Sequence, residues 1–142
     1  MDPLDYRTDA DSRLGGADIT ISVTADQARA LGADLQAIAE WTHTALTALA
    51  LLRTGIDPDG TETTPESLHP AITAIDTQLL PRLQGIKDAA VRRHASLGGS
   101  LGQLSHAMDS TKSTAQSRRK AILDGPGRPS TWEKWATDGP TQ

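Results

Sequence analysis

The stretch TADQARALGADLQAIAEWTHTALTALALLRTG, residues 24–55, decides the fold class. It opens with a capping box, in which the Thr24 hydroxyl can accept from the Gln27 N–H while the Gln27 side chain reaches back to Thr24. Apolar side chains, with one threonine among them, then recur at alternating steps of three and four residues, as on a helix packed along its length. They are Ala28, Leu31, Leu35, Ile38, Thr42, Ala45, Leu49 and Leu52. Because Gly55 is a typical stop, we predict a helix over residues 25–54.

A second, longer pattern of the same kind follows a loop of turn-forming residues at 55–66. Its apolar steps run from Leu68 to Met108 and beyond, with doubled steps of four near Pro81 and near Gly98, where the backbone bends most easily. We therefore expect a long, kinked helix over residues 67–123. The two patterns predict an all-α fold, an antiparallel helical hairpin. Each helix can cover only one stripe of the other, so we expect the hairpin to pair into a four-helix bundle.

The chain ends differ from this central part in composition. Residues 1–18 are short, polar and acidic, which is typical of a disordered leader. The alternating segment 19–23 is interpreted as an extended lead-in to the first helix, because no partner strand is evident. The expected organisation is a leader at 1–18, a hairpin domain at 19–124 and a flexible tail at 125–142. The tail carries Trp132 and Trp135, which either fold back onto the hairpin or form a docking motif for another protein.

Composition excludes several other classes of protein. The 142 residues include three Trp, one Tyr and no Phe, which argues against a β-sandwich or a layered α/β core. The absence of Cys excludes disulfides, thiolate metal sites and cysteine catalysis. The acidic beginning does not resemble a cleavable Sec signal, and no apolar run approaches the ~20 residues that span a bilayer.

The net charge of −4 is unevenly distributed along the chain. Residues 1–66 carry twelve acidic and four basic side chains, or −8, whereas residues 67–128 carry four acidic and nine basic ones, or +5. Such opposite halves favour solubility and can orient a hairpin or its pairing with a second chain. The densest basic cluster comprises Lys112, Arg118, Arg119, Lys120 and Arg128. It makes nucleic-acid binding the third hypothesis, although bases near a helix C-terminus also stabilise the helix dipole.

No catalytic or metal-binding motif is present in the sequence. The four histidines, at 43, 69, 94 and 106, show no metal-ligand spacing, and no serine lies in a nucleophile-elbow motif. The Gly98–Gly102 segment lacks the Lys-Ser/Thr of a phosphate loop. We therefore expect no enzymatic activity, no cofactor, no metal and no small-molecule substrate.

Two segments together resemble the ESAT-like (WxG-type) superfamily of helical hairpins, in particular its actinobacterial branch associated with type VII secretion. These are VTADQARALGADL at 23–35 and HASLGGSLGQLSHAMD at 94–109. The resemblance covers about residues 19–123 and lies in pattern and composition. It implies homo- or heterodimers that form four-helix bundles and are exported without a Sec signal, as substrates or as escorts of larger effectors. The Trp-x-Gly turn and the Tyr-x-x-x-Asp/Glu export signal of the family are absent, so no site residue is carried over.

Our first hypothesis is a helical protein-interaction module, a type VII secretion-associated substrate or escort that pairs with another helical protein. The alternative is a cytoplasmic structural or adaptor subunit of a larger assembly, recruited through its Trp tail. We expect a cytoplasmic protein, with export without a Sec signal left open. The expected partner-binding residues are Leu31, Leu35, Ile38, Trp41, Leu49, Leu97, Leu101, Leu104, Met108, Trp132 and Trp135.

Overall fold

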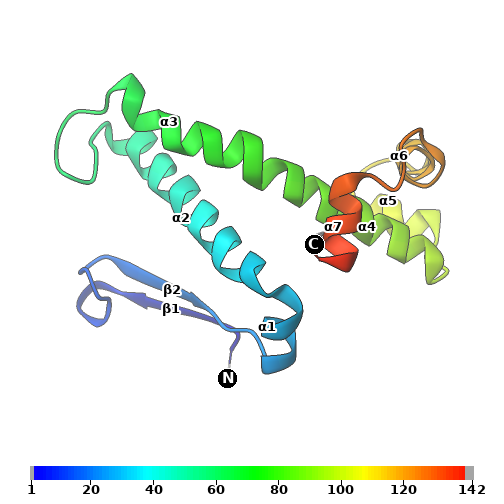
Figure 1. Cartoon of the computed structure of the whole chain (residues 1–142), viewed down its shortest axis with the longest axis horizontal. Helices are drawn as coiled ribbons and strands as arrows, with labels where there is room; N and C mark the ends of the chain where they lie inside the picture. The colour runs from blue at the N-terminus through cyan, green and yellow to red at the C-terminus, as the bar shows by residue number, and fades with distance from the viewer. Residues whose placement is uncertain (1, 140–142) are drawn as a thin grey trace. The chain divides into compact units, whose positions relative to one another are not determined.

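The computed structural model describes residues 2–139. It consists mainly of helices and contains one small two-stranded sheet (Figure 1). The mainly helical class is confirmed, and the all-α expectation did not include the small sheet. The chain divides into two compact units between Gln36 and Ala37, within the first long helix, and each unit is described separately below.

The first unit begins with a β-hairpin where we expected a disordered leader. Strand β1 (Leu4–Thr8) pairs antiparallel with β2 (Ala17–Ile21), and a 3-10 turn, η1 (Asp9–Asp11), follows β1. The alternating segment 19–23, which we expected to be an extended lead-in without a partner, thus lies partly in strand β2. Its partner is LDYRT, within the acidic segment 1–18, and this stretch itself alternates apolar and polar side chains.

The capping box at Thr24 is present, with the Gln27 N–H donating to Thr24 Oγ1 and the Thr24 N–H donating to Gln27 Oε1. The predicted helix 25–54 is nevertheless two helices, α1 (Ala25–Leu31) and α2 (Ala33–Thr54). Gly32 separates them with φ of 55°, a left-handed conformation that glycine adopts at little cost.

In the second unit, α3 (Pro65–Thr73), the π-helical segment η2 (Ala74–Leu79) and α4 (Leu80–Ser96) form one continuous helix that returns antiparallel to α2 (Figure 1). The wider π turn lies directly before Pro81, which lacks the N–H that an α-helix needs there. The bend expected near Pro81 thus coincides with a local change in helix type.

The predicted long helix over 67–123 was wrong beyond residue 96. A turn at Gly98, with φ of 83°, separates α4 from α5 (Leu101–Ala107), and a second turn leads to α6 (Lys112–Asp124). Each helix has its own cap, since Ser100 Oγ accepts from the Gln103 N–H and Thr111 Oγ1 accepts from the Thr114 N–H.

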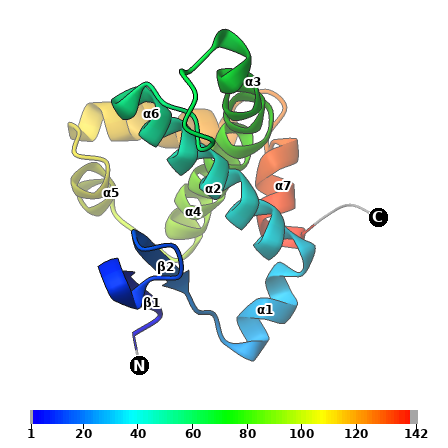
Figure 2. The same cartoon turned by 90° about the vertical axis from the view of Figure 1, so that its left-hand side faces the viewer.

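The main core lies where α5 and α6 pack beside α4 (Figure 2). Its buried members are Val91, Leu104, Ala115 and Ile122, with Met108 packed against them. The last helix, α7 (Thr131–Asp138), also packs against α4 (Figures 1 and 2). Residues 131–138 of the expected flexible tail are therefore a docked helix, while residues 140–142 lie outside the described part. Among residues 2–139, no helix is long and apolar enough to cross a bilayer.

Candidate interaction site

Helix α7 begins with a capping box formed by Ser130 and Glu133, within a polar segment that we expected to be a flexible tail. The Glu133 N–H donates to Ser130 Oγ at 3.2 Å, and the Ser130 N–H donates to Glu133 Oε2 at 2.8 Å. This reciprocal pair satisfies two of the donors that a helix N-terminus leaves free. The same carboxylate faces α4, so the cap also positions the charge that attaches α7 to the rest of the unit.

Glu133 is 2% exposed and lies among three other charged side chains. Arg92 Nε is 3.0 Å from Glu133 Oε1, and Arg128 Nη1 lies 3.0 Å from Glu133 Oε2 and 2.9 Å from Asp88 Oδ2. Asp88 is also buried and accepts a hydrogen bond from Gln84. Two carboxylates thus face two guanidinium groups. Removing one of these side chains would leave a buried charge without its partner.

The environment of Glu133 sets the direction of its pKa. Burial raises the pKa of Glu133, but hydrogen bonds from the Ser130 N–H, Arg92 and Arg128 outweigh burial and hold the pKa below its ordinary value of 4.5. The side-chain hydrogen bonds to Asp88 and Glu133 raise the pKa of Arg128. The network therefore keeps Glu133 ionised at neutral pH and holds α7 against α4.

All three tryptophans of the chain surround one arginine. The Arg82 guanidinium carbon lies 4.5 Å from the ring centres of Trp41 and Trp132 and 5.5 Å from that of Trp135. Trp132 and Trp135 also meet edge to face, with ring centres 5.9 Å apart. Cation–π attraction at this range joins α2, α4 and α7 through a single side chain.

Gly85 on α4 allows α7 to approach closely. A Cβ at position 85 would lie 2.6 Å from both the Cβ and the carbonyl oxygen of Trp132. Together with the ionic network, this contact shows that Trp132 and Trp135 fold back onto their own chain. Of the two alternatives that the sequence left open for them, the structure therefore supports the fold-back and not a free docking motif.

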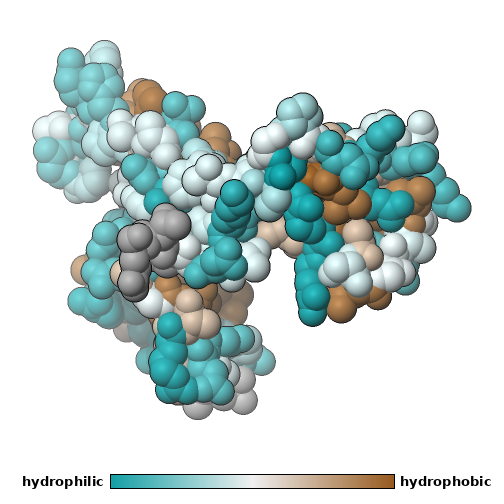
Figure 3. Space-filling view, turned by 45° about the vertical axis from the view of Figure 1, so that its right-hand side comes forward, coloured by the Kyte–Doolittle hydropathy of each residue, from teal (hydrophilic) through white to brown (hydrophobic). Residues whose placement is uncertain are grey.

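Other apolar side chains of the second unit remain exposed. On α2, Leu46, Leu49 and Leu52 are 51%, 42% and 71% exposed, and on α4, Leu80, Leu83 and Ile86 are 54%, 48% and 43% exposed. A spacing of three residues places each set along one side of its helix. We call these sets the α2 row and the α4 row. The space-filling view shows apolar side chains emerging between polar ones on this unit (Figure 3).

The structure distributes the expected partner-binding residues among several environments. Leu49 lies in the α2 row, and Leu97 is exposed beside the turn that ends α4. Leu31 and Leu35 are exposed at 38% and 37%, but both belong to the first unit. Leu104 is 4% exposed in the protein's own core, so its assignment as a partner contact was wrong. Half-buried positions are Ile38, Trp41, Leu101, Met108, Trp132 and Trp135.

Sequence reasoning missed Arg82, Asp88, Arg92 and Glu133, and it placed Arg128 in a basic surface cluster. Arg128 is instead paired with Asp88 and Glu133, which removes one base from the cluster considered for nucleic acid. The signal that could have revealed this site is the Ser130–Glu133 capping pattern directly after Pro129. Within residues 2–139, no three His, Cys, Asp or Glu side chains gather into a potential metal site.

Comparison with known proteins gave no relative for this arrangement. A scan against protein-family models found no match, and searches of curated proteins and of solved structures found none either.

Proposed function

We propose that the protein is a non-enzymatic helical interaction module that pairs with another helical protein, as a homodimer or a heterodimer. The observation that carries this proposal is the pair of exposed apolar rows on α2 and α4. Burying a large aliphatic side chain contributes about 1.5–3 kcal/mol, so six of them left partly in water represent a substantial unused driving force. An apolar stripe on each of two antiparallel helices fits a partner that supplies two more helices.

The type VII secretion-associated role belongs to the same proposal. Support for it comes from the antiparallel course of α2 and the continuous α3–η2–α4 helix, joined by a loop at residues 55–64 (Figure 1). This arrangement agrees with the helical hairpin that the resemblance implies. A partner with a similar hairpin would complete a four-helix bundle, and the chain would act as a substrate or an escort without a Sec signal.

The adaptor hypothesis and the nucleic-acid hypothesis receive less support. Recruitment through the Trp tail requires α7 to leave α4, because Trp132 and Trp135 surround Arg82. Binding to phosphates through the basic cluster would have to proceed without Arg128, which two carboxylates already engage.

The test combines substitutions in both rows with measurement of mass in solution. We expect the wild-type chain, alone or co-expressed with helical hairpin proteins encoded beside it, to sediment as a dimer. Leu49→Gln combined with Leu83→Gln should remove the association that depends on the two rows and so lower the mass of that species. Leu14→Gln is the matched control, because Leu14 is 96% exposed and belongs to neither row.

A chain that stays monomeric in every combination would contradict the proposal, as would a species whose mass in solution the double substitution leaves unchanged. The secretion role is tested separately by comparing the amount of the protein in culture supernatant and in cells, with and without a working type VII apparatus. Retention in the cells under both conditions would leave the interaction module and exclude the exported substrate.

A further inference from the structure

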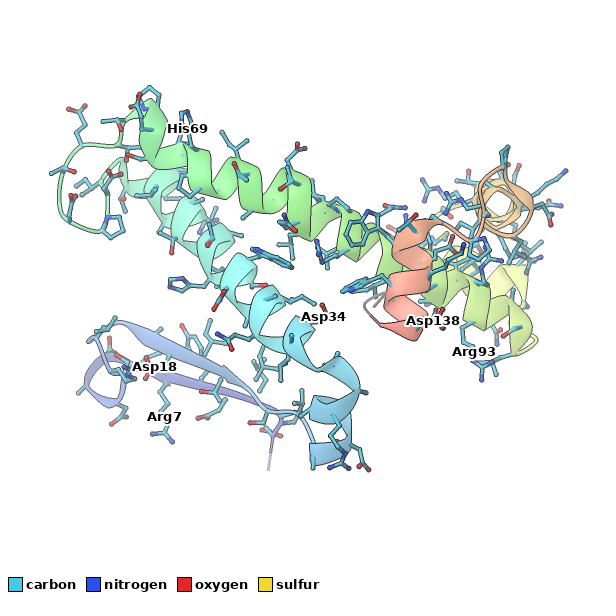
Figure 4. The ribbon with its side chains drawn as sticks, in the orientation of Figure 1. Arg7, Asp18, Asp34, His69, Arg93 and Asp138 are labelled. Atoms are coloured by element: carbon cyan, nitrogen blue, oxygen red, sulfur yellow. The ribbon has the colours of Figure 1, made fainter. Side chains whose placement is uncertain are left out.

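The hairpin of the first unit has one apolar and one polar face. The register pairs Leu4 with Ile21 and Tyr6 with Ile19 on one face. These four side chains are exposed at 58%, 71%, 63% and 55%, respectively. The other face carries Asp5, Arg7, Asp18 and Thr20 (Arg7 and Asp18 are labelled in Figure 4). Two strands alone are marginally stable in water, and further strands stabilise such a sheet.

The hydrogen-bonding pattern identifies which backbone groups of β1 are free to pair. The Ser22 N–H donates to the Pro3 carbonyl, and the Asp9 N–H donates to the Gly16 carbonyl. Since bonded and non-bonded pairs alternate in an antiparallel ladder, Asp5 and Arg7 bond to β2. The N–H and C=O groups of Leu4, Tyr6 and Thr8 therefore point away from β2, along the outer edge of the hairpin.

From this edge we propose that two copies of the chain pair through β1, antiparallel and with a two-fold axis at Tyr6, into a four-stranded sheet. In this register Tyr6 faces Tyr6 of the second copy, and Leu4 faces Thr8. All three outward-pointing residues then form bonded pairs, about six hydrogen bonds in total. Strand β1 belongs to the first unit and both helical rows to the second, so the inference does not rest on the proposed function.

The charges on β1 select this register. With the axis at Tyr6, Asp5 of each copy lies opposite Arg7 of the other in a non-bonded pair, where the Cα atoms are only about 4.5 Å apart. Within one chain, Arg7 Nε lies 3.2 Å from Asp5 Oδ2, so both side chains already occupy the same face. Pairing through β2 about Ile19 would instead place Asp18 opposite Thr20, with no opposite charge. Charged edge strands usually repel other strands, but this one is complementary to itself.

Charge exchange tests the register directly. We expect Asp5→Arg and Arg7→Asp, each alone, to raise the dissociation constant of the homodimer about tenfold, because each places like charges opposite one another twice. An equimolar mixture of the two variants should regain wild-type affinity, since every cross-strand pair is then opposite in charge. The double variant should also regain it. All chains carry Leu49→Gln and Leu83→Gln, so that pairing through the helical rows does not contribute.

A cross-link locates the axis, because the native chain has no cysteine. Tyr6→Cys should oxidise to a disulfide-linked dimer. The matched control Ile19→Cys should not, since its two copies would lie three strand spacings, about 14 Å, apart.

The inference is overturned by a monomeric chain, by charge variants that associate like the wild type, by mixtures that fail to recover, or by equal cross-linking at both positions. If another helix covers the apolar face instead, the charge variants have no effect. A different result is that the charge variants behave as expected while Leu49→Gln with Leu83→Gln, in a chain with wild-type β1, leaves the mass in solution unchanged. In that case only the proposed function fails.

Discussion

The two ends of the second unit use similar side chains in opposite ways. Where α4 to α7 meet, Leu104 and Ile122 are at most 5% exposed, and even the carboxylate of Glu133 is buried. Where α2 faces α3, burial is limited to small residues and Leu51, and the leucines of the α2 row remain in water. At the first end, segments of the same chain cover one side of α4 and leave the α4 row exposed, whereas at the other end no such segment of the described second unit covers the α2 row.

This difference in coverage indicates which surface needs a partner protein. At the α4–α7 end, α5, α6 and α7 return toward α4 and supply the side chains that pack against it. Nothing comparable in the described part of the second unit returns over the α2 row. Comparable apolar side chains therefore form a core on the covered side of α4 and a candidate interface along the two exposed rows. The following experiments test that contrast.

Removing the buried carboxylate should have the largest effect. Glu133→Ala leaves Arg92 and Arg128 facing each other without their shared partner and also deletes half of the α7 capping box. We expect a loss of about 3 kcal/mol in the free energy of unfolding. Denaturant titration followed by tryptophan emission measures it, and the emission should shift to longer wavelength as α7 separates from α4.

Glu133→Gln is the matched control for that experiment. It retains the size of the side chain and an oxygen that can accept from the Ser130 N–H, but it removes the charge. Its cost should therefore be clearly smaller than that of Glu133→Ala. Equal unfolding free energies for Glu133→Ala and the wild type would show that α7 is not held by this network.

Filling the contact between α4 and α7 should have the next largest effect. Gly85→Ala places a methyl group 2.6 Å from the Trp132 carbonyl oxygen, so α7 must move, at a cost of about 1–3 kcal/mol. Gly102→Ala is the control. A Cβ there meets Lys112 Cε at 3.5 Å, an ordinary contact, and alanine favours the helix. If thermal unfolding shows the two variants to be equally stable, the close approach of α7 is not present in solution.

Acid should loosen the same end of the unit. Because the pKa of folded Glu133 lies below 4.5, its ionised form stabilises the folded state at all pH values above that. This contribution falls as the pH drops through the folded pKa, when Glu133 takes up a proton. Tryptophan emission followed from about pH 6 to about pH 3 should move to longer wavelength, and Glu133→Gln should lack that step. An unchanged acid transition in the variant would assign the step to other carboxylates.

The local patterns in the sequence marked most helix starts, but our prediction gave apolar spacing more weight than capping patterns. Thr24 with Gln27 correctly marked the start of α1, and the same kind of capping pattern occurs at Ser100 with Gln103 and at Ser130 with Glu133. At Ser100 our prediction followed the apolar spacing from Leu97 to Leu104, which continues through a doubled step of four, and did not consider the cap. Periodicity cannot distinguish one helix from two consecutive helices that preserve the spacing across a turn.

The candidate site was less predictable because its contacts are distant in sequence. Glu133 bonds to Arg92, 41 residues earlier, and Arg128 bonds to Asp88, 40 residues earlier. A charged residue in a polar segment is normally exposed, so no local pattern indicated burial. The hairpin was missed for a related reason, since β2 was visible in the alternation but β1 lay within a segment whose acidic composition favoured disorder.

The smallest effect on stability should come from the exposed end, and it separates a core from an interface most directly. Leu46→Ala removes a side chain that is 51% exposed, so the unfolding free energy of the monomer should change by less than about 0.5 kcal/mol. The identical change Leu104→Ala, at 4% exposure, should cost about 2–5 kcal/mol. Measured at a concentration where the chain is monomeric, a large cost at Leu46 would mean that the α2 row is already covered within one chain. If the cost is small in the monomer and grows as the concentration rises, the covering surface belongs to a second molecule.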